Sequence, residues 1–108
     1  MVIEIKGTKV NRAIIEQAIK TKSIIEFSYK GHHRIAEPHV LGVSKGDLQV
    51  LSYQVGGTSN SGGVPNWRRF ELIGITNLVI TDRKFNGRRP FPSGHHSIWD
   101  EKLLIVSP

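Results

Sequence analysis

The spacing of apolar residues is helical near the N-terminus and strand-like in the rest of the chain. The helical part has two adjacent pairs of apolar residues, and the pairs are four residues apart: Ile14 and Ile15, then Ala18 and Ile19. This stripe predicts one amphipathic helix, which we expect to begin at Asn11 as its cap and to end near Lys22. Glu16 and Lys20 lie four residues apart and are expected to pair on another face.

Short alternating segments separated by turn residues predict that the rest of the chain is β-structure. A hairpin turn is expected at 30–33 and a further turn at 45–47, and Pro38 confines its strand to an edge or a bend. The expected strands are residues 2–6, 24–29, 34–43, 48–55, 67–73, 78–82 and 103–106. One helix with five or more antiparallel strands predicts a mainly β (α+β) fold, either a small barrel or a strongly bent sheet.

The length of 108 residues fits one domain. We expect an N-terminal strand segment at 1–10, the helix and the barrel at 11–85, and an irregular arm at 86–108 with a C-terminal strand. That last strand is expected to close the sheet or to pair with another chain. The glycine-rich segment 56–63 is either a loose hairpin tip or a lid over a ligand.

The charge of the chain favours an anionic partner. Lys and Arg exceed Asp and Glu by 15 − 9 = 6, which favours partners such as nucleic acid, nucleotides or phosphate, although many basic proteins of this size bind no acidic partner. There is no cysteine, so disulfides and thiolate metal sites are excluded. No apolar run reaches the roughly 18 residues of a membrane span, and we expect a cytoplasmic protein without a membrane partner.

The sequence carries no motif that would indicate an enzyme, a cofactor or a metal site. The paired histidines at 32–33 and 95–96 would point to opposite faces of a strand, and no carboxylate stands at ligand spacing from them. There is no Gly-x-Ser-x-Gly, no P-loop and no paired-carboxylate motif. We therefore expect a non-enzymatic protein without a cofactor.

Arg68 is the most informative charged residue because it shares strand parity with Phe70 and Leu72. That parity points it toward the core, where a guanidinium is costly unless it is paired or hydrated. Arg68 therefore lies at a rim, pairs with a carboxylate such as Glu37, or lines a polar channel that holds an anionic ligand. Arg34 follows a turn and is expected to be exposed.

Other polar and aromatic residues are open to two interpretations. His39 is either a plain core or surface histidine or a ligand contact, and Arg69 faces away from the core and is expected to be solvated. Tyr29, Tyr53, Phe70 and Trp67 are core aromatics or, if exposed, stacking platforms for the bases of a single strand.

The order of these signals resembles the WYL domain over residues 12–90. The resemblance is carried by a helix followed by four segments: Ile24–Tyr29, Arg34-x-x-x-Pro38, a strand with Tyr53-Gln54, and Trp67-Arg68-Arg69-Phe70-x-Leu72 before a terminal Phe85. The chain departs from the family pattern at two places. The name-giving Trp-Tyr-Leu run is replaced by Leu48-Gln49-Val50, and Gly74 stands where an arginine is common.

The resemblance implies an Sm-like, SH3-type barrel that senses an anionic ligand, with single-stranded nucleic acid or a nucleotide as the leading candidates. Such domains occur in bacterial transcription regulators and in defence systems, and this chain looks like a free-standing member. By motif position the ligand-binding residues would be Arg34 and Arg68, with His39, Tyr53 and Gln54 as further candidates. The alternative hypothesis is a structural module that forms oligomers through an exposed edge strand.

Overall fold

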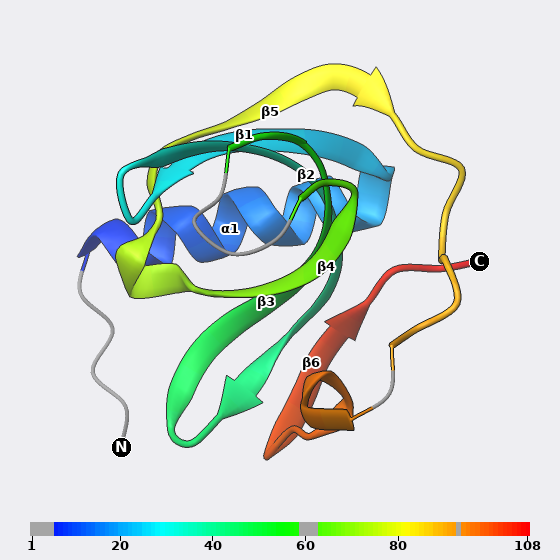
Figure 1. The fold of residues 1–108 in the computed structure, drawn as a ribbon. Helices are drawn as coiled ribbons and strands as arrows, with labels where there is room; N and C mark the ends of the chain where they lie inside the picture. The colour runs from blue at the N-terminus through cyan, green and yellow to red at the C-terminus, as the bar shows by residue number, and fades with distance from the viewer. Residues whose placement is uncertain (1–5, 59–62, 93) are drawn as a thin grey trace.

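One helix and one curved antiparallel sheet make up the fold in the computed structural model, which describes residues 6–58, 63–92 and 94–108 (Figure 1). The elements are α1 (Lys6–Thr21), β1 (Ser23–Tyr29), β2 (His32–Ser44), β3 (Asp47–Gly57), β4 (Asn66–Glu71), the 3₁₀ turn η1 (Leu72–Gly74), β5 (Thr76–Lys84), the 3₁₀ turn η2 (Gly94–Ser97) and β6 (Glu101–Ile105). The mainly β fold with one N-terminal helix is therefore confirmed. The strand expected at 2–6 lies outside the described residues except for Lys6, which begins α1.

α1 begins five residues before the predicted cap. Asn11 lies inside the helix, and its side-chain amide donates hydrogen bonds to the carbonyls of Leu72 (3.2 Å) and Ile75 (3.0 Å). The prediction of Asn11 as a cap was wrong, because α1 begins before it. Its side chain instead bonds α1 to the turn after β4. The apolar stripe is confirmed, since its members Ile15, Ala18 and Ile19 are all buried.

The ion pair on α1 also differs from the expected one. Glu16 accepts a hydrogen bond from Nε of Arg12 at 2.9 Å, and this pair is one turn N-terminal to the predicted pair with Lys20. Both spacings are four residues, so the sequence alone does not choose between them. The pair is about one third exposed and contributes little to stability.

β2 is the central strand, and it changes neighbours at Pro38. The sheet order is β4-β3-β2-β1-β5, with β6 also paired to β2. Residues 32–36 of β2 pair with β1, whereas residues 40–43 pair with β6. Proline cannot donate a ladder hydrogen bond, so the predicted bend at Pro38 falls where one neighbour ends and the next begins. His39 is an extra residue there, because Pro38 faces Ser52 and Val40 faces Leu51.

The hairpins follow the sequence closely. Lys30-Gly31 and Lys45-Gly46 are two-residue turns in which all four residues have positive φ, the geometry that matches strand twist. β4 ends at Glu71, two residues before the predicted end, because Leu72 and Ile73 belong to η1. β6 pairs with β2 of its own chain.

The two faces of the sheet have different coverings. The core face carries the buried residues Ile25 and Phe27 of β1, Ala36 of β2, Val50 of β3 and Phe70 of β4, and α1 adds its stripe to this cluster. Edge-to-face contacts at about 5 Å join the ring of Phe70 to those of Phe27 and Tyr29. The opposite face, here called the arm face, carries Glu37, His39, Tyr53, Trp67 and Arg69 and lies beneath the chain that follows β5.

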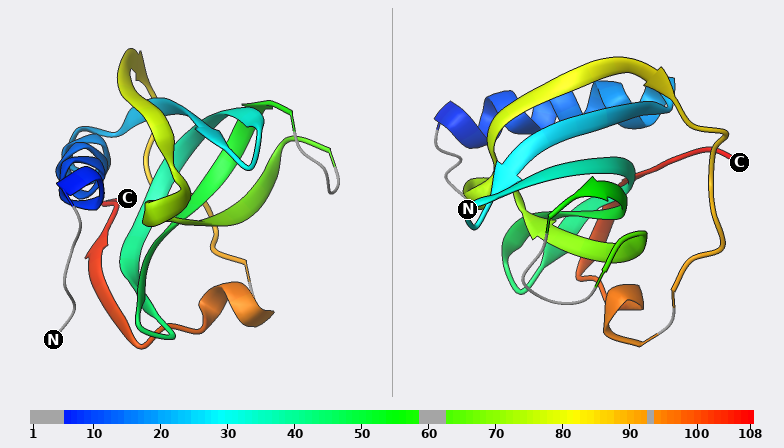
Figure 2. Two further views of the ribbon diagram at one scale, coloured as in Figure 1. Left: turned by 90° about the vertical axis from the view of Figure 1, so that its left-hand side faces the viewer. Right: turned by 45° about the horizontal axis from the view of Figure 1, so that its top comes forward.

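The sheet curls strongly but is not closed in the described part of the chain. Its order ends at β4 on one side and β5 on the other, and no pairing joins them (Figure 2). After β5 the chain passes down one side of the molecule to η2 and returns along β6 (Figure 1). Among the described residues no helix combines the length and the apolarity that a membrane crossing requires.

Gly42 allows β6 and the preceding Trp99 to dock on β2. A Cβ atom at Gly42 would lie 2.5 Å from the backbone oxygen of Glu101 and 2.7 Å from Cε3 of Trp99. We expect Gly42→Ala to lower the free energy of unfolding by about 1–3 kcal/mol, because a backbone atom must move to make room. Urea unfolding measures the change.

Gly7→Ala is the matched control, because a Cβ atom at Gly7 would have no neighbour within 4 Å. It should leave the free energy of unfolding unchanged or raise it by up to about 1 kcal/mol through helix propensity. Equal stability of Gly42→Ala and the unsubstituted chain would contradict the close docking of β6.

Candidate anion-binding site

The core face becomes polar at one end, where four side chains form what we call the polar cluster: Arg34, Ser52, Gln54 and Arg68. Ser52 lies directly opposite Arg68 in the β3–β4 register. Ser52 and Gln54 have no exposed surface, and Arg34 is 5% exposed, whereas Arg68 is half-buried. The cluster therefore continues the apolar core with groups that are able to bind a polar ligand.

Arg34 is held in place from several sides. Its Nη2 donates to the backbone oxygen of Tyr29 (3.1 Å), and its Nη1 donates to Oε1 of Gln54 (3.3 Å). The guanidinium carbon also lies 5.8 Å from the ring centre of Tyr29 and 5.5 Å from that of Phe70. The expectation that Arg34 is exposed was wrong, because its strand continues the core face instead of leaving the turn toward solvent.

In the described part of the chain, the buried polar atoms of the polar cluster without a hydrogen-bond partner include Nε of Arg34 and Oγ of Ser52. In the described part of the chain the bonds of Arg34 go to a carbonyl and an amide oxygen, and none goes to a carboxylate. A buried donor without a partner costs about 1–3 kcal/mol, and more when it is charged. An anion that accepts from these atoms would remove that cost.

The electrostatics of the polar cluster also favour an anion. Burial lowers the pKa of Arg34, and the like charge of Arg68 lowers it further. The two guanidinium groups are therefore close enough to repel each other, which a bound negative charge would relieve. Because an arginine remains protonated near neutral pH, the polar cluster carries two positive charges.

The structure divides the five predicted ligand residues between the two faces. Arg34, Gln54 and Arg68 meet on the core face, as the strand parity of Arg68 predicts. His39 and Tyr53 lie on the arm face, where His39 is fully buried and Tyr53 is half-buried. Ser52 was not among the predicted residues, although it shares strand parity with Gln54 and so lies on the same face.

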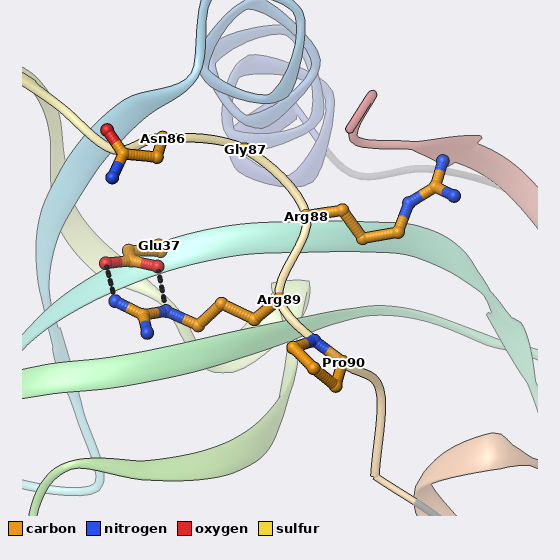
Figure 3. Close-up of a pocket in the computed structure, with 6 residues that line it drawn as sticks. All are labelled: Glu37, Asn86, Gly87, Arg88, Arg89 and Pro90. Carbon is orange, nitrogen blue, oxygen red and sulfur yellow. Dashed lines mark hydrogen bonds and ion pairs between the residues drawn. The ribbon is translucent and has the colours of Figure 1, made fainter.

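The suggested pairing of Arg68 with Glu37 is wrong, because Glu37 is on the arm face and pairs with Arg89. Nε and Nη2 of Arg89 donate to the two carboxylate oxygens of Glu37 at 2.7 and 3.0 Å (Figure 3). The guanidinium carbon of Arg89 lies 4.4 Å from the ring centre of Tyr53. No regular pattern marks residue 89, so nothing in the sequence signals this contact.

A pocket of about 250 Å³ lies beside this ion pair. It is lined by Glu37, Asn86, Gly87, Arg88, Arg89 and Pro90. The side chain of Arg88 extends away from Glu37, toward the C-terminal segment, and donates from Nε and Nη2 to the carbonyl of Val106 (Figure 3). In this pocket Arg89 is paired with the carboxylate of Glu37, and Arg88 is bonded to the carbonyl of Val106. Neither arginine is available to an anion, so the polar cluster is the better anion site.

Arg69 is on the arm face, as parity predicts, but the expectation that it is simply solvated was wrong. It donates to the carbonyls of His96 (2.7 Å) and Ile98 (2.9 Å), and its guanidinium carbon lies 3.9 Å from the ring centre of Trp99. Arg69 therefore holds η2 and the chain after it against the sheet.

The described residues include no group of three or more His, Asp or Glu side chains placed to hold a metal ion. His33 contacts Glu26 (3.1 Å), and His32 contacts the hydroxyl of Thr58 (2.9 Å). The lid suggested by the glycine-rich segment falls partly outside the described residues. Gly56 and Gly57 end β3, and residues 59–62 are not described.

Gly74 has a structural reason to be glycine. A Cβ atom there would lie 2.9 Å from Cε1 of Tyr29. The hydroxyl of Tyr29 accepts a hydrogen bond from the backbone N–H of Glu71 at 3.1 Å, which fixes the ring beside Arg34. A larger residue at 74 would displace the ring, so the lack of a side chain at this position is matched to the position of Tyr29.

Comparisons with known proteins add no assignment. Searches of protein-family models, of curated proteins and of solved structures gave no match.

Ser52→Ala tests whether the hydroxyl in the polar cluster is unsatisfied. Removing a buried hydroxyl that has no partner should raise the free energy of unfolding of the ligand-free protein by about 1 kcal/mol. The measurement is urea unfolding in a buffer without phosphate or sulfate.

Ser23→Ala is the matched control. Ser23 is also fully buried, but its Oγ lies 2.7 Å from Nζ of Lys84 and 2.7 Å from the hydroxyl of Thr21. This substitution should lower stability by about 1–2 kcal/mol. If Ser52→Ala destabilises the protein as much as Ser23→Ala, the hydroxyl of Ser52 already has a hydrogen-bond partner and is not available to a ligand.

Proposed function

We propose that this protein is a non-enzymatic sensor that binds an anionic ligand, single-stranded nucleic acid or a nucleotide, at the polar cluster. The observation that carries the proposal is the buried Arg34, which lacks a carboxylate partner in the described residues and has an unpartnered Nε beside a second arginine. Natural proteins seldom bury such a charge unless it has a partner. A phosphate group is a partner of the right charge and geometry.

The burial of the two arginines suggests how a ligand would bind. Arg68 is half-buried and is the more accessible of the two, whereas Arg34 is almost enclosed. In the proposal Arg68 meets a phosphate at the surface of the polar cluster, and Nε of Arg34 with Oγ of Ser52 completes its hydrogen bonds from inside. Binding would then act by stabilising one conformational or oligomeric state over another.

The WYL resemblance and the Sm-like, SH3-type barrel remain part of the proposal. Support comes from the order of elements, in which a helix precedes consecutive antiparallel strands and a 3₁₀ turn separates β4 from β5. The strong curl of the sheet and the sharing of β2 between β1 and β6 also suit a small, partly open barrel (Figure 2). In this proposal the protein is a regulatory domain of the cytoplasm.

The binding test uses short labelled single strands of DNA and RNA and labelled mononucleotides, measured by fluorescence anisotropy. Arg68→Gln should weaken binding about tenfold to a hundredfold, because one charge-assisted contact to phosphate is lost. Arg34→Lys should also weaken binding, since lysine keeps the charge but lacks the planar fork. For a single strand, the slope of log K against log salt should become less negative by about 0.7 in Arg68→Gln.

Arg83→Gln is the matched control, because Arg83 is an exposed arginine on β5, away from the polar cluster. It changes the net charge by the same amount and should leave affinity nearly unchanged. Equal losses in Arg68→Gln and Arg83→Gln would show general attraction to a basic protein and would refute the site.

A second function, oligomerisation through an edge strand, is favoured by one observation. β5 pairs with β1 on one side, and Val79 and Ile80 on it are 53% and 37% exposed. An exposed edge with apolar side chains is able to pair with another chain. The C-terminal strand is less suited to this role than the sequence suggested, because it pairs with β2.

Val79→Lys tests this alternative, because a lysine on an edge strand opposes pairing between chains. If β5 forms the interface, light scattering should show an oligomer that dissociates in this variant. Val10→Lys, at an exposed position on α1 away from this edge, is the comparison for added charge. A monomer in the unsubstituted chain at all concentrations would rule the alternative out.

A further inference from the structure

The chain after β5 crosses the arm face as an extended segment, and its residues 86–92 are here called the arm. His39 is the point where the arm meets the sheet. Its ring is fully buried, stacks on Phe85 with centres 5.3 Å apart, and lies edge-on to Trp67 at 4.9 Å and Phe91 at 6.1 Å. As the extra residue of the β2 bulge, His39 is held in this position by the backbone of the sheet.

The hydrogen bonds of His39 fix its protonation state. Nε2 accepts a hydrogen bond from the backbone N–H of Arg89 at 3.2 Å. Nδ1 therefore carries the proton and donates to the carbonyl of Glu37 at 2.9 Å. Both ring nitrogens are used, one as acceptor and one as donor, which only a neutral imidazole can satisfy.

A second proton on His39 would oppose the arm in two ways. The new N–H at Nε2 would face the N–H of Arg89, so a hydrogen bond would become a repulsive contact between two donors. The charged ring would also be repelled by Arg88 and Arg89 of the arm, which lower the pKa of His39, whereas the carboxylate of Glu37, paired with Arg89, raises it. The other residues packed against the ring are the uncharged aromatic residues Trp67 of β4 and Phe85 after β5.

We propose that His39 is a proton-sensitive latch: the arm stays docked while the ring is neutral, and mild acidification releases it. Release separates Arg89 from Glu37 and Tyr53, and Phe91 from Trp67. The arm face of β3 and β4, with the half-buried rings of Tyr53 and Trp67, then becomes accessible. The latch is on the face opposite the polar cluster and does not depend on ligand binding there.

The direction of the pH effect follows from burial. In the docked state, burial lowers the pKa of His39 below its ordinary value of 6.5. In the released state the ring is exposed to water, and its pKa returns toward 6.5. The released state therefore binds more protons between these two values. Docking is at full strength above about pH 6.5 and weakens as the pH falls, by up to tenfold in the equilibrium constant per pH unit for one proton.

The test is the hydrogen-exchange protection factor of the Arg89 backbone amide, measured by NMR on the full chain from pH 7.5 to 5. The protection factor corrects for the intrinsic pH dependence of exchange. We expect it to be constant above about pH 6.5 and to fall below that value by up to tenfold per pH unit. The amide of Phe27 in β1 should keep its protection, which shows that the sheet stays folded.

Two variants separate His39 from the other histidines. His39→Gln supplies an amide donor and an amide oxygen acceptor that do not titrate, so the protection of Arg89 should become independent of pH. His33→Gln removes an exposed histidine that pairs with Glu26 and should keep the pH dependence of the unsubstituted chain.

A measurement on the unsubstituted chain keeps the test decisive even if His39→Gln does not fold. The ring resonances of His39 should titrate with a midpoint below 6.5, and the Arg89 amide should shift with the same midpoint. Constant protection of Arg89 down to pH 5, or the same loss in a folded His39→Gln variant, would overturn the latch.

Discussion

The change of neighbours along β2 is the constraint around which both faces of the sheet are arranged. One strand pairs with β1 before Pro38 and with β6 after it, while β3 follows it along the other side. Arg34 lies on the core face before Pro38, beside Gln54 and the rings of Tyr29 and Phe70. His39, the extra residue at the same place, follows Glu37 in strand alternation and therefore lies on the opposite face, beneath the arm. β2 therefore carries a residue of the candidate ligand site on one face and the residue of the candidate latch on the other.

Burying Arg34 is unfavourable for the ligand-free protein. Its guanidinium gains two hydrogen bonds and lies near two aromatic rings, but it loses water, faces Arg68, and leaves Nε without a partner. Replacing buried charges by apolar groups often stabilises a protein. The proposed binding function would account for a buried arginine here, since functional sites commonly contain groups that stability alone would not favour.

The sequence predicted those parts of the fold that local patterns specify. Alternation located the strands, and turn residues located both hairpins, because each is determined within a few residues. Asn11 was misassigned because its role in the structure depends on contacts with Leu72 and Ile75, which are more than 60 residues away. A cap is defined locally, whereas these contacts are tertiary.

In the candidate site, too, local patterns were predictable from the sequence and tertiary contacts were not. Strand parity places Arg68 on the core face, but parity alone does not show that Arg34 is buried, since that depends on the curl of the sheet. Parity also places Ser52 on the face of Gln54, but its position opposite Arg68 follows from the register of β3 and β4. The docking of Arg89 on Glu37 could not be predicted, because the arm has no repeating pattern and its position depends on partners in β2 and β3.

The central claim is that the unpartnered Nε of Arg34 is held ready for an anion. NMR of the arginine Nε–H groups tests it most directly, in a titration of the ¹⁵N-labelled chain with a short 5′-phosphorylated single strand and, separately, with pyrophosphate. We expect the resonances of Arg34 and Arg68 to shift together and saturate while that of Arg83 stays in place. An Arg34 resonance that does not move while the ligand saturates the protein would contradict the claim.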